Sequence, residues 1–516
     1  MSTSFDPNLW LKFFQRHKTK TFFCLCVLWP LLRFVLGKII RRVRRLPPGP
    51  EQYFFIFNHF FANRPQFLRN IFDDLSRAYG DICYFSWGIH NVVMISNPKI
   101  VRELFGHALL DRYQHFFHPL DQPDDLSWKN GEEWSQRRSL ATSTFFRAAT
   151  TSYVTTVMNE TMDKYLVPEI VNSTSNIWCP RDVLGFLTWN MTYTCIYGYS
   201  VTPDDEMFCA NDVYEKKIPK TWNLLRYGYD HVKRWILRRM VNTWWDQSMA
   251  MHELFPSFRR RTHLHAGYAG SYLDRIMRIY GTDAAYGEMQ AMLDSHESVS
   301  NSAEFVLAYA AKYPKLQQLL RDELKAVITD VPVAGENGFV HIDVLENIKR
   351  LPHLQAFVHD VLRVTGTGSW GIPRTNAEEI WIEGYRIPAN TFIIANANYM
   401  QKHDARLWKN SIFNKGLDEI CLENWLAQNE DTKEMQFVST PEQAFFAFGT
   451  GKRICPGKMM ALYEIYCIFG QLIWNYQIDM VGPTENPHDN QFIETAGSII
   501  QRLLHPACLR MIRLKE

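Results

Sequence analysis

The stretch that most constrains this chain runs from Phe448 to Gly457 and reads F-G-T-G-K-R-I-C-P-G. An apolar run over 458–473, compatible with a helix, follows it directly. A cysteine thiolate is stabilised by backbone N–H groups and by the positive end of a helix dipole, and this segment offers both to Cys455. Its glycines allow close approaches that a side chain would forbid. The segment therefore predicts a firmly held thiolate against which a flat cofactor can lie.

Two simpler interpretations compete with this one. A lone cysteine is most often a small core residue, and a glycine cluster alone is weak evidence for a binding loop. A zinc site is disfavoured because the next cysteine, Cys467, lies twelve residues further on. The complete pattern F-x-x-G-x-R-x-C-x-G is nevertheless intact, at Phe448, Gly451, Arg453, Cys455 and Gly457. It resembles the haem-thiolate loop of the cytochrome P450 superfamily.

This resemblance implies a mainly α fold with a smaller β region, the cytochrome P450 fold, holding one haem b (iron protoporphyrin IX). Cys455 would be the metal ligand, and its thiolate would donate electron density to iron. The implied activity is that of a monooxygenase, which inserts one oxygen atom into a lipophilic small molecule while the other becomes water. Microsomal, fungal-like members imply an endoplasmic reticulum membrane, secondary metabolism and electrons from NADPH through a reductase that docks near the basic Cys455 side.

Composition agrees with a large globular enzyme. The chain has 516 residues, of which 46% are hydrophobic, so it can bury a sizeable core. A formal net charge of +2 gives no reason to expect nucleic acid as a partner. Ten cysteines without regular spacing indicate reduced thiols rather than a disulfide framework.

The N-terminus predicts a membrane anchor. It is apolar over 21–40, apart from Arg33 and Lys38, and four arginines follow over 41–45. A helix with snorkelling cations would be long enough to span a bilayer, although a short buried helix is the alternative. We therefore expect three parts: an anchor with its basic flank over 1–45, a stiff proline-rich hinge over 46–50, and a cytosol-facing catalytic domain over 51–516.

Apolar periodicity predicts the main elements of the catalytic domain. We expect a helix over 64–79 and a β-hairpin over 82–95, then a mobile loop over 109–126. Further helices are expected over 152–171, 181–197, 220–250 and 287–314, and short strands over 381–385, 386–388 and 391–397.

Trp134 and Arg138 are one helical turn apart on one face of a helix. Arginine can bind a carboxylate through two hydrogen bonds, and an indole can pack or donate beside it. The pair resembles the W-x-x-x-R element of the superfamily, which implies contact with a haem propionate. Arg374 stands where the family places another propionate-binding arginine. An exposed helix face is the alternative for Trp134 and Arg138.

Glu297 and Ser298 fall where the superfamily carries an acid followed by an alcohol. Such groups can relay protons during oxygen activation, directly or through water. The sequence departs from the family here, since Ser295 replaces the usual glycine and serine replaces the usual threonine. An ordinary polar interruption of a helix is the alternative.

Two other family elements are altered. Asp360 and Arg363 resemble the E-x-x-R pair, but aspartate is one methylene shorter than the usual glutamate. Asn424 stands where a third, cationic member of that cluster is expected. These departures leave open a non-catalytic haem-binding scaffold protein. A haem-thiolate isomerase or dehydratase that does not use dioxygen is the other alternative, and the Glu297–Ser298 pair argues against it.

Overall fold

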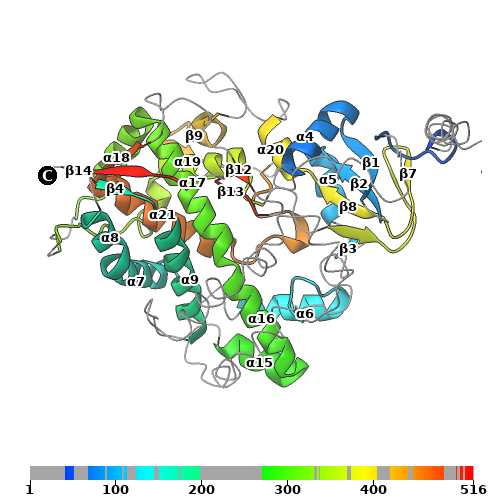
Figure 1. Ribbon diagram of the computed structural model, residues 1–516, viewed down its shortest axis with the longest axis horizontal. Helices are drawn as coiled ribbons and strands as arrows, with labels where there is room; N and C mark the ends of the chain where they lie inside the picture. The colour runs from blue at the N-terminus through cyan, green and yellow to red at the C-terminus, as the bar shows by residue number, and fades with distance from the viewer. Residues whose placement is uncertain are drawn as a thin grey trace, which may run out of the picture.

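The five-stranded sheet and the long helices occupy different ends of the molecule (Figure 1). The computed structural model describes residues 41–50, 68–87, 90–106, 110–112, 124–143, 150–173, 176–197, 270–330, 334–335, 337–368, 373–403, 419–439, 445–481, 495–496, 500–503 and 506–514. A five-stranded sheet with the order β1-β2-β8-β5-β3 lies at one end. Helices gather around a larger apolar core at the other end, as predicted for a mainly α protein with a smaller β region.

The sheet is apolar on both faces because its strands alternate between two buried clusters. Strands β1 (Ile82–Trp87) and β2 (His90–Ile95) form the predicted antiparallel hairpin, and β8 (Phe392–Ala395) runs parallel to β2. One face presents Ile82, Tyr84, Val93, Ile95, Ile393 and Ala395, and the other presents Cys83, Phe85, Val92, Met94, Phe392 and Ile394. Helix α5 (Pro98–Gly106) packs on the first face and α4 (Leu68–Tyr79) on the second.

The segment predicted as a loop over 109–126 contains a strand, so the prediction was wrong for three residues. Strand β3 (Leu110–Arg112) pairs antiparallel with β5 (Arg374–Asn376), and this pairing places Arg112 opposite Arg374. Three residues are too few to show a strand periodicity, so only the contact with β5 defines the element.

Most other predicted elements are present. Helix α4 ends at Tyr79 and is followed by Gly80, whose φ of 85° is the left-handed conformation expected after a helix. The helix expected over 152–171 is α7 (Thr151–Thr161), a π-helical turn η5 (Met162–Leu166) and α8 (Val167–Val171), and α9 spans Arg181–Tyr197 as predicted. Strands β6 (Ile380–Ile382) and β7 (Tyr385–Ile387) form a second hairpin. The helix predicted over 220–250 and the anchor residues 1–40 lie outside the described residues.

The long helix predicted over 287–314 is broken at Ser295. Helix α16 (Thr282–Asp294) ends there and α17 (His296–Lys312) begins after it, before α18 (Pro314–Val327). Serine hydroxyls compete with the helix for backbone carbonyls. Ser295 Oγ donates to the Met292 carbonyl (2.6 Å), and Ser298 Oγ donates to the Ser295 carbonyl (3.0 Å). The two helices still run as one diagonal across the molecule (Figure 1).

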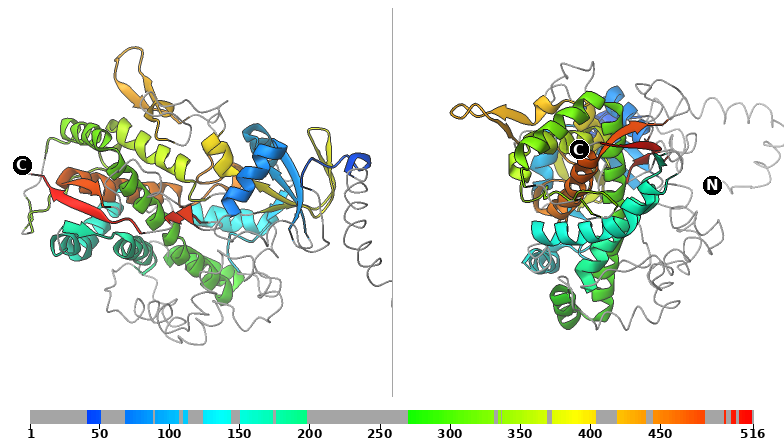
Figure 2. Two further views of the ribbon diagram at one scale, coloured as in Figure 1. Left: turned by 45° about the horizontal axis from the view of Figure 1, so that its top comes forward. Right: turned by 90° about the vertical axis from the view of Figure 1, so that its left-hand side faces the viewer.

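Helices α19 (Pro352–Thr365) and α21 (Lys458–Asn475) pack with α17 in the helical core. Figure 2 shows the hairpin of β9 (Leu426–Gln428) and β10 (Met435–Phe437) projecting from this part of the molecule. Strand β14 (Leu509–Arg513) lies between β11 (Tyr476–Met480) and β4 (Ile177–Trp178) in a small separate sheet.

The proline-rich segment 46–50 is packed on the sheet. Tyr84 N–H of β1 donates to the Pro48 carbonyl (2.8 Å), and Arg41 donates to the carbonyls of Gly49 and Pro50. A helical turn over 41–43 precedes this segment. Across the portion of the chain that the structure describes, no helix has both the length and the apolar character needed to traverse a bilayer.

Candidate functional site

The loop before α21, residues 448–457, is closed on itself by backbone hydrogen bonds, and we call it the cysteine loop. Cys455 N–H donates to the Phe448 carbonyl (2.8 Å), and the turn η10 (Gly451–Arg453) lies between them. Gly451 has a φ of 68°, and a Cβ atom built on it would lie 2.5 Å from the Phe105 carbonyl oxygen of α5. Only glycine satisfies both conditions, so this residue allows the loop to pack against α5.

The Cys455 side chain is exposed, although protein atoms surround it closely enough to affect its titration. This partial burial raises the pKa of the Cys455 thiol, while the Gly457 N–H and the charge of Arg138 act in the opposite direction. Gly457 is the N-cap of α21. A bound metal cation would favour the thiolate strongly, because cysteine ligates metal in its deprotonated form. The site therefore provides an accessible sulfur with two groups that favour its charged state.

Helix α6 (Gly131–Ala141) brings Trp134 and Arg138 to this loop. The guanidinium of Arg453 lies over the Trp134 ring, 4.0 Å from its centroid. Arg453 Nη2 also donates to the Lys129 carbonyl (2.6 Å) and to Asn130 Oδ1 (2.9 Å). Helix α6 and the cysteine loop are thus in direct contact.

Arg112 is a site residue that sequence reasoning missed. Its backbone N–H donates to Asn130 Oδ1 (2.9 Å), and Asn130 Nδ2 donates back to the Arg112 carbonyl (3.1 Å). Asn130 therefore joins β3 to both α6 and Arg453. Arg112 lies in an aperiodic stretch, and only its register opposite Arg374 reveals its place. We call Arg112, Arg138, Arg374 and Arg453 the arginine cluster.

Burial and mutual repulsion act on the arginine cluster. Burial, followed by the charges of Arg374 and Arg138, lowers the pKa of Arg453 to about 9. Burial lowers the pKa of Arg374 to about 10. The pKa of Arg112 is also lowered well below its usual value, first by burial and then by Arg374 and Arg453. The electrostatics thus favour binding of an anion.

The residues present fit a haem, whose two carboxylates would meet this cluster. Arg374 Nε and Arg453 Nη1 are buried without a hydrogen-bond partner. Leaving a buried donor unsatisfied is costly, whereas an arginine N–H bonds strongly to carboxylate. Among the described residues, no group of three or more His, Cys, Asp or Glu side chains could hold a metal ion. A single accessible thiol beside buried cations suits an acidic metal complex such as haem.

Glu297 and Ser298 lie on the first turn of α17. Both are half-buried, and Ser298 uses its hydroxyl proton on the Ser295 carbonyl. The cysteine loop and the arginine cluster are joined to each other by the contacts described above. The Glu297–Ser298 pair lies on a different element, directly after the break between α16 and α17.

Comparison with known proteins decides the family. The family described as "Cytochrome P450" matches residues 47–501. The chain belongs to the cytochrome P450 family. Similar curated proteins include a trans-cinnamate 4-monooxygenase from Oryza sativa subsp. japonica, which is 25% identical over 90% of this chain and 95% of its own length. The cytochrome P450 monooxygenase peniB from Penicillium patulum is 23% identical over 84% of this chain and 78% of its own. Cytochrome P450 2B4 from Oryctolagus cuniculus is 23% identical over 88% and 94%, respectively.

Family membership confirms the predicted P450 fold and identifies a haem-thiolate monooxygenase, an oxidoreductase with haem iron as its cofactor. The isomerase, dehydratase and scaffold alternatives are not favoured, because similar proteins are named as monooxygenases.

In this P450 the altered E-x-x-R element forms a complete ion pair. Arg363 Nε and Nη2 donate to the two Asp360 oxygens at 2.6 and 3.0 Å, and both side chains are fully buried. Arg363 also donates to the carbonyls of Gln401 and Glu419. The shorter aspartate therefore pairs with arginine through both oxygens.

Trp425 donates a hydrogen bond to Asp360 where a third, cationic member of the cluster is expected. Trp425 Nε1 donates to Asp360 Oδ1 (2.8 Å), and Cys421 N–H donates to Asp360 Oδ2 (2.6 Å). The Trp425 ring stacks on Phe437 with an interplanar angle of 8°. Asn424, beside Trp425, thus departs from the family pattern without leaving Asp360 unpaired.

Proposed function

We propose that Cys455 ligates haem iron through its thiolate and that the arginine cluster binds the haem carboxylates, with Trp134 packed beneath Arg453. One observation carries this proposal: two buried guanidinium N–H groups, on Arg374 and Arg453, lack partners beside an accessible thiol. When bound, the haem would supply the capacity to activate dioxygen. Gly451 and Gly457 would support the loop, and Phe448 lies against Phe445, with ring centroids 6.2 Å apart.

Glu297 and Ser298 are assigned to proton delivery. Ser298 has lone pairs available to accept a proton while its own proton is bonded to the Ser295 carbonyl. Glu297 is adjacent and carries a carboxyl group, so the two can pass a proton between solvent and the reacting oxygen.

Electrons are proposed to come from NADPH through a reductase that docks near the cysteine loop. Lys452 is exposed and Lys458 is half-buried on the two sides of Cys455. This basic surface would attract an acidic partner and raise its association rate.

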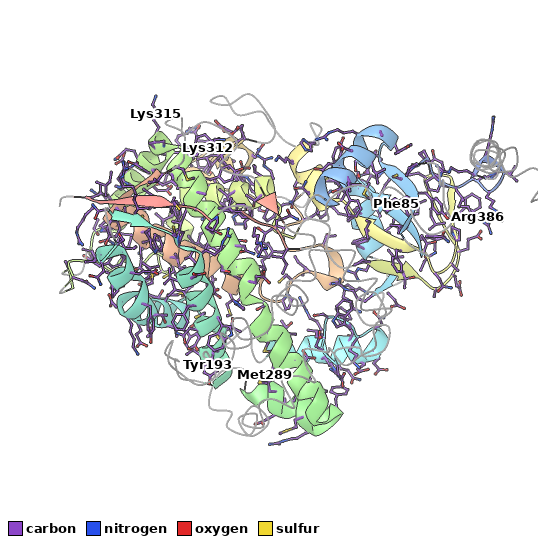
Figure 3. The ribbon with its side chains drawn as sticks, in the orientation of Figure 1. Phe85, Tyr193, Met289, Lys312, Lys315 and Arg386 are labelled. Carbon is purple, nitrogen blue, oxygen red and sulfur yellow. The ribbon has the colours of Figure 1, made fainter. Side chains whose placement is uncertain are left out.

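The catalytic domain, proposed to span 51–516, is assigned to the cytosolic side of the endoplasmic reticulum membrane, anchored through 1–45 and the hinge at 46–50. Val43 and Trp381 are 76% and 53% exposed. The Arg45 guanidinium lies 6.0 Å from the Trp381 ring, and Arg386 N–H donates to the Arg45 carbonyl. Figure 3 shows Arg386 at the extreme edge of this end of the molecule. Exposed tryptophan with arginines suits the headgroup region of a membrane.

The substrate is proposed to be a lipophilic small molecule of secondary metabolism, which a membrane-bound enzyme can draw from the lipid phase. The test uses the full-length haem protein with a reductase, NADPH and a panel of such molecules. We expect substrate-dependent NADPH consumption and a product that carries one atom of labelled dioxygen. Conversion of substrate without dioxygen or NADPH would contradict the proposal and indicate isomerase or dehydratase chemistry.

Two variants separate the roles within this reaction. Cys455→Ser should abolish the activity, because the ligand that activates the haem is lost. Ser298→Ala should lower the amount of product formed per NADPH consumed, while Ser300→Ala, a control from the same turn, should leave this ratio unchanged. An unchanged ratio in Ser298→Ala would remove the proton-delivery assignment.

A further inference from the structure

Two cysteines far apart in sequence meet where β4 and β14 pair. Leu509 pairs with Trp178 in the antiparallel register, so the next position along the ladder places Cys508 opposite Cys179. Their sulfur atoms are 3.0 Å apart, although the residues are separated by 329 positions in the chain. A disulfide bond needs sulfur atoms about 2.05 Å apart, so side-chain movements of about 1 Å would suffice to form one.

Solvent can reach this pair. Cys179 is exposed and Cys508 is half-buried, whereas Cys83, Cys195, Cys421 and Cys467 are buried. Cys455, which is also exposed, belongs to the proposed haem site. Small oxidants can therefore reach the Cys179–Cys508 pair while the core thiols remain protected.

We propose that Cys179 and Cys508 are a redox modification site, in which a small-molecule disulfide such as glutathione disulfide converts the two thiols into a reversible cross-link between β4 and β14. One cysteine thiolate attacks the small disulfide, forms a mixed disulfide and releases one glutathione thiolate. The second cysteine thiolate then attacks the protein sulfur of the mixed disulfide and releases the other. Two protein thiols are oxidised, two glutathione thiols are produced, and the two cysteine protons end on glutathione.

The surroundings of the pair set the rate of this reaction. Burial raises the pKa of Cys179 to about 11, and its hydrogen bond with Cys508 and the carboxylates of Glu169 and Glu304 act in the same direction. Because the thiolate is the nucleophile, oxidation should be slow at neutral pH and accelerate as pH rises.

The cross-link would close a loop around a buried contact of α17. Ala507 N–H donates to Glu304 Oε1 (2.9 Å), and Arg181 Nε donates to Glu304 Oε2 (3.0 Å). Arg181 Nη2 also reaches the Leu503 carbonyl (2.9 Å). Cys179 and Cys508 are close neighbours of Arg181 and Ala507 in the chain. The disulfide would therefore hold these two chain segments together on Glu304 and stabilise the folded protein.

The test uses the full-length haem protein at fixed ratios of reduced to oxidised glutathione. Remaining thiols are alkylated, and digestion followed by mass spectrometry identifies linked peptides. We expect one linked peptide that contains Cys179 and Cys508, reversal by dithiothreitol, and a rate that rises about tenfold per pH unit between pH 7 and 9. The oxidised protein should unfold at a temperature several degrees higher than the reduced protein.

Cys179→Ser and Cys508→Ser are the matched variants, and both should lose the linked peptide and the gain in unfolding temperature. Because the linked peptide is measured directly, the result does not depend on activity. A persistent glutathione adduct on Cys179 or Cys508 in the unsubstituted protein would overturn the proposal. So would cross-links only between molecules, or no oxidation of the pair at all.

Discussion

The Asp360–Arg363 pair and the arginine cluster of this P450 differ in how completely their arginines are paired. Arg363 lies against both Asp360 oxygens and two backbone carbonyls, and neither side chain of the pair is exposed. In the arginine cluster, Arg374 and Arg453 each retain a buried N–H without a partner. Cations there also lower one another's pKa. The first arrangement is closed by protein groups, whereas the second is incomplete without an anion.

This contrast distinguishes an ion pair that stabilises the fold from residues that we propose to bind a ligand. A buried ion pair is expensive to break because the remaining charge is left in an apolar interior. A group of like charges that is partly shielded from water is already unfavourable, so removing one of them should cost the haem-free protein little stability. Substitutions in the Asp360–Arg363 pair should therefore lower the stability of the haem-free protein. Substitutions in the arginine cluster should instead lower the affinity for haem.

The largest expected effect comes from breaking the buried ion pair between Asp360 and Arg363. Arg363→Met should lower the free energy of unfolding by about 3–5 kcal/mol, because Asp360 stays buried without its cation. The matched control is Arg77→Met, which removes another Asp–Arg pair three residues apart on a helix. There the side chains are 52% and 74% exposed, so the loss should be under about 1 kcal/mol. Denaturant unfolding measures both values, and equal losses would contradict the distinction.

The pH dependence of stability should report on His359, which packs beside Trp425 next to the Asp360–Arg363 pair. Burial lowers the pKa of His359 to about 4, from its usual value near 6.5, and its ring lies 5.3 Å from the Trp425 ring. Between these values the unfolded chain binds a proton that the folded protein does not. Stability from this group is therefore fully present above about pH 6.5 and falls as pH decreases to 4.

His359→Gln should remove this part of the slope, which amounts to roughly 3 kcal/mol over the whole window. Denaturant unfolding at several pH values between 4 and 7 makes the comparison. An identical slope in the variant and in the original protein would show that His359 is not held neutral in the folded state.

Substitution in the arginine cluster should leave the stability of the haem-free protein nearly unchanged but weaken haem binding. Arg374→Gln should leave the unfolding free energy of the haem-free protein unchanged or slightly higher, since a repelling cation is removed. Loss of one hydrogen bond to a charged partner, about 1.5–3 kcal/mol, should raise the haem dissociation constant about 10- to 150-fold. Haem transfer to an acceptor protein measures the affinity, with the exposed Arg386→Gln as control. A large loss of stability in the haem-free protein would contradict this, because it would show that Arg374 stabilises the fold as Arg363 does.

The smallest expected effect comes from removing the hydrogen bond that Trp425 donates to Asp360. Trp425→Phe removes the indole donor to Asp360 while keeping the aromatic ring beside Phe437 and Phe445. Because Arg363 and Cys421 still bind Asp360, the variant should lose about 1 kcal/mol of unfolding free energy. Asn424→Ala, one residue earlier, should lose less. The reverse order would show that Asn424 carries the missing third role.

The sequence predicted those parts of the site that lie within continuous motifs. The loop around Cys455 and the pair Trp134 and Arg138 depend on local spacing, which a sequence displays directly. The contact between Trp134 and Arg453 and the place of Arg112 arise from tertiary register between segments hundreds of residues apart. Such contacts have no local signature, so only the structure reveals them.

The lack of a local signature also explains which elements of the fold were predicted wrongly. The helices and the apolar β-hairpin were predicted because burial imposes a period of 3.6 or 2 residues. The strand β3 was missed because three residues show no period, and the break at Ser295 was missed because hydroxyl groups compete with the helix for carbonyls. Replacement of the third cation by Trp425 also depends on where an indole points, which spacing alone does not determine.

The most direct test of the haem-thiolate site is the absorption spectrum of the purified protein, reduced with dithionite, before and after addition of carbon monoxide. A thiolate ligand from Cys455 predicts a strongly red-shifted Soret band in the carbon monoxide complex, and this band should be absent in Cys455→Ser. A haem spectrum without that shift would contradict the account, because it would mean that the ligand is a neutral thiol or another residue.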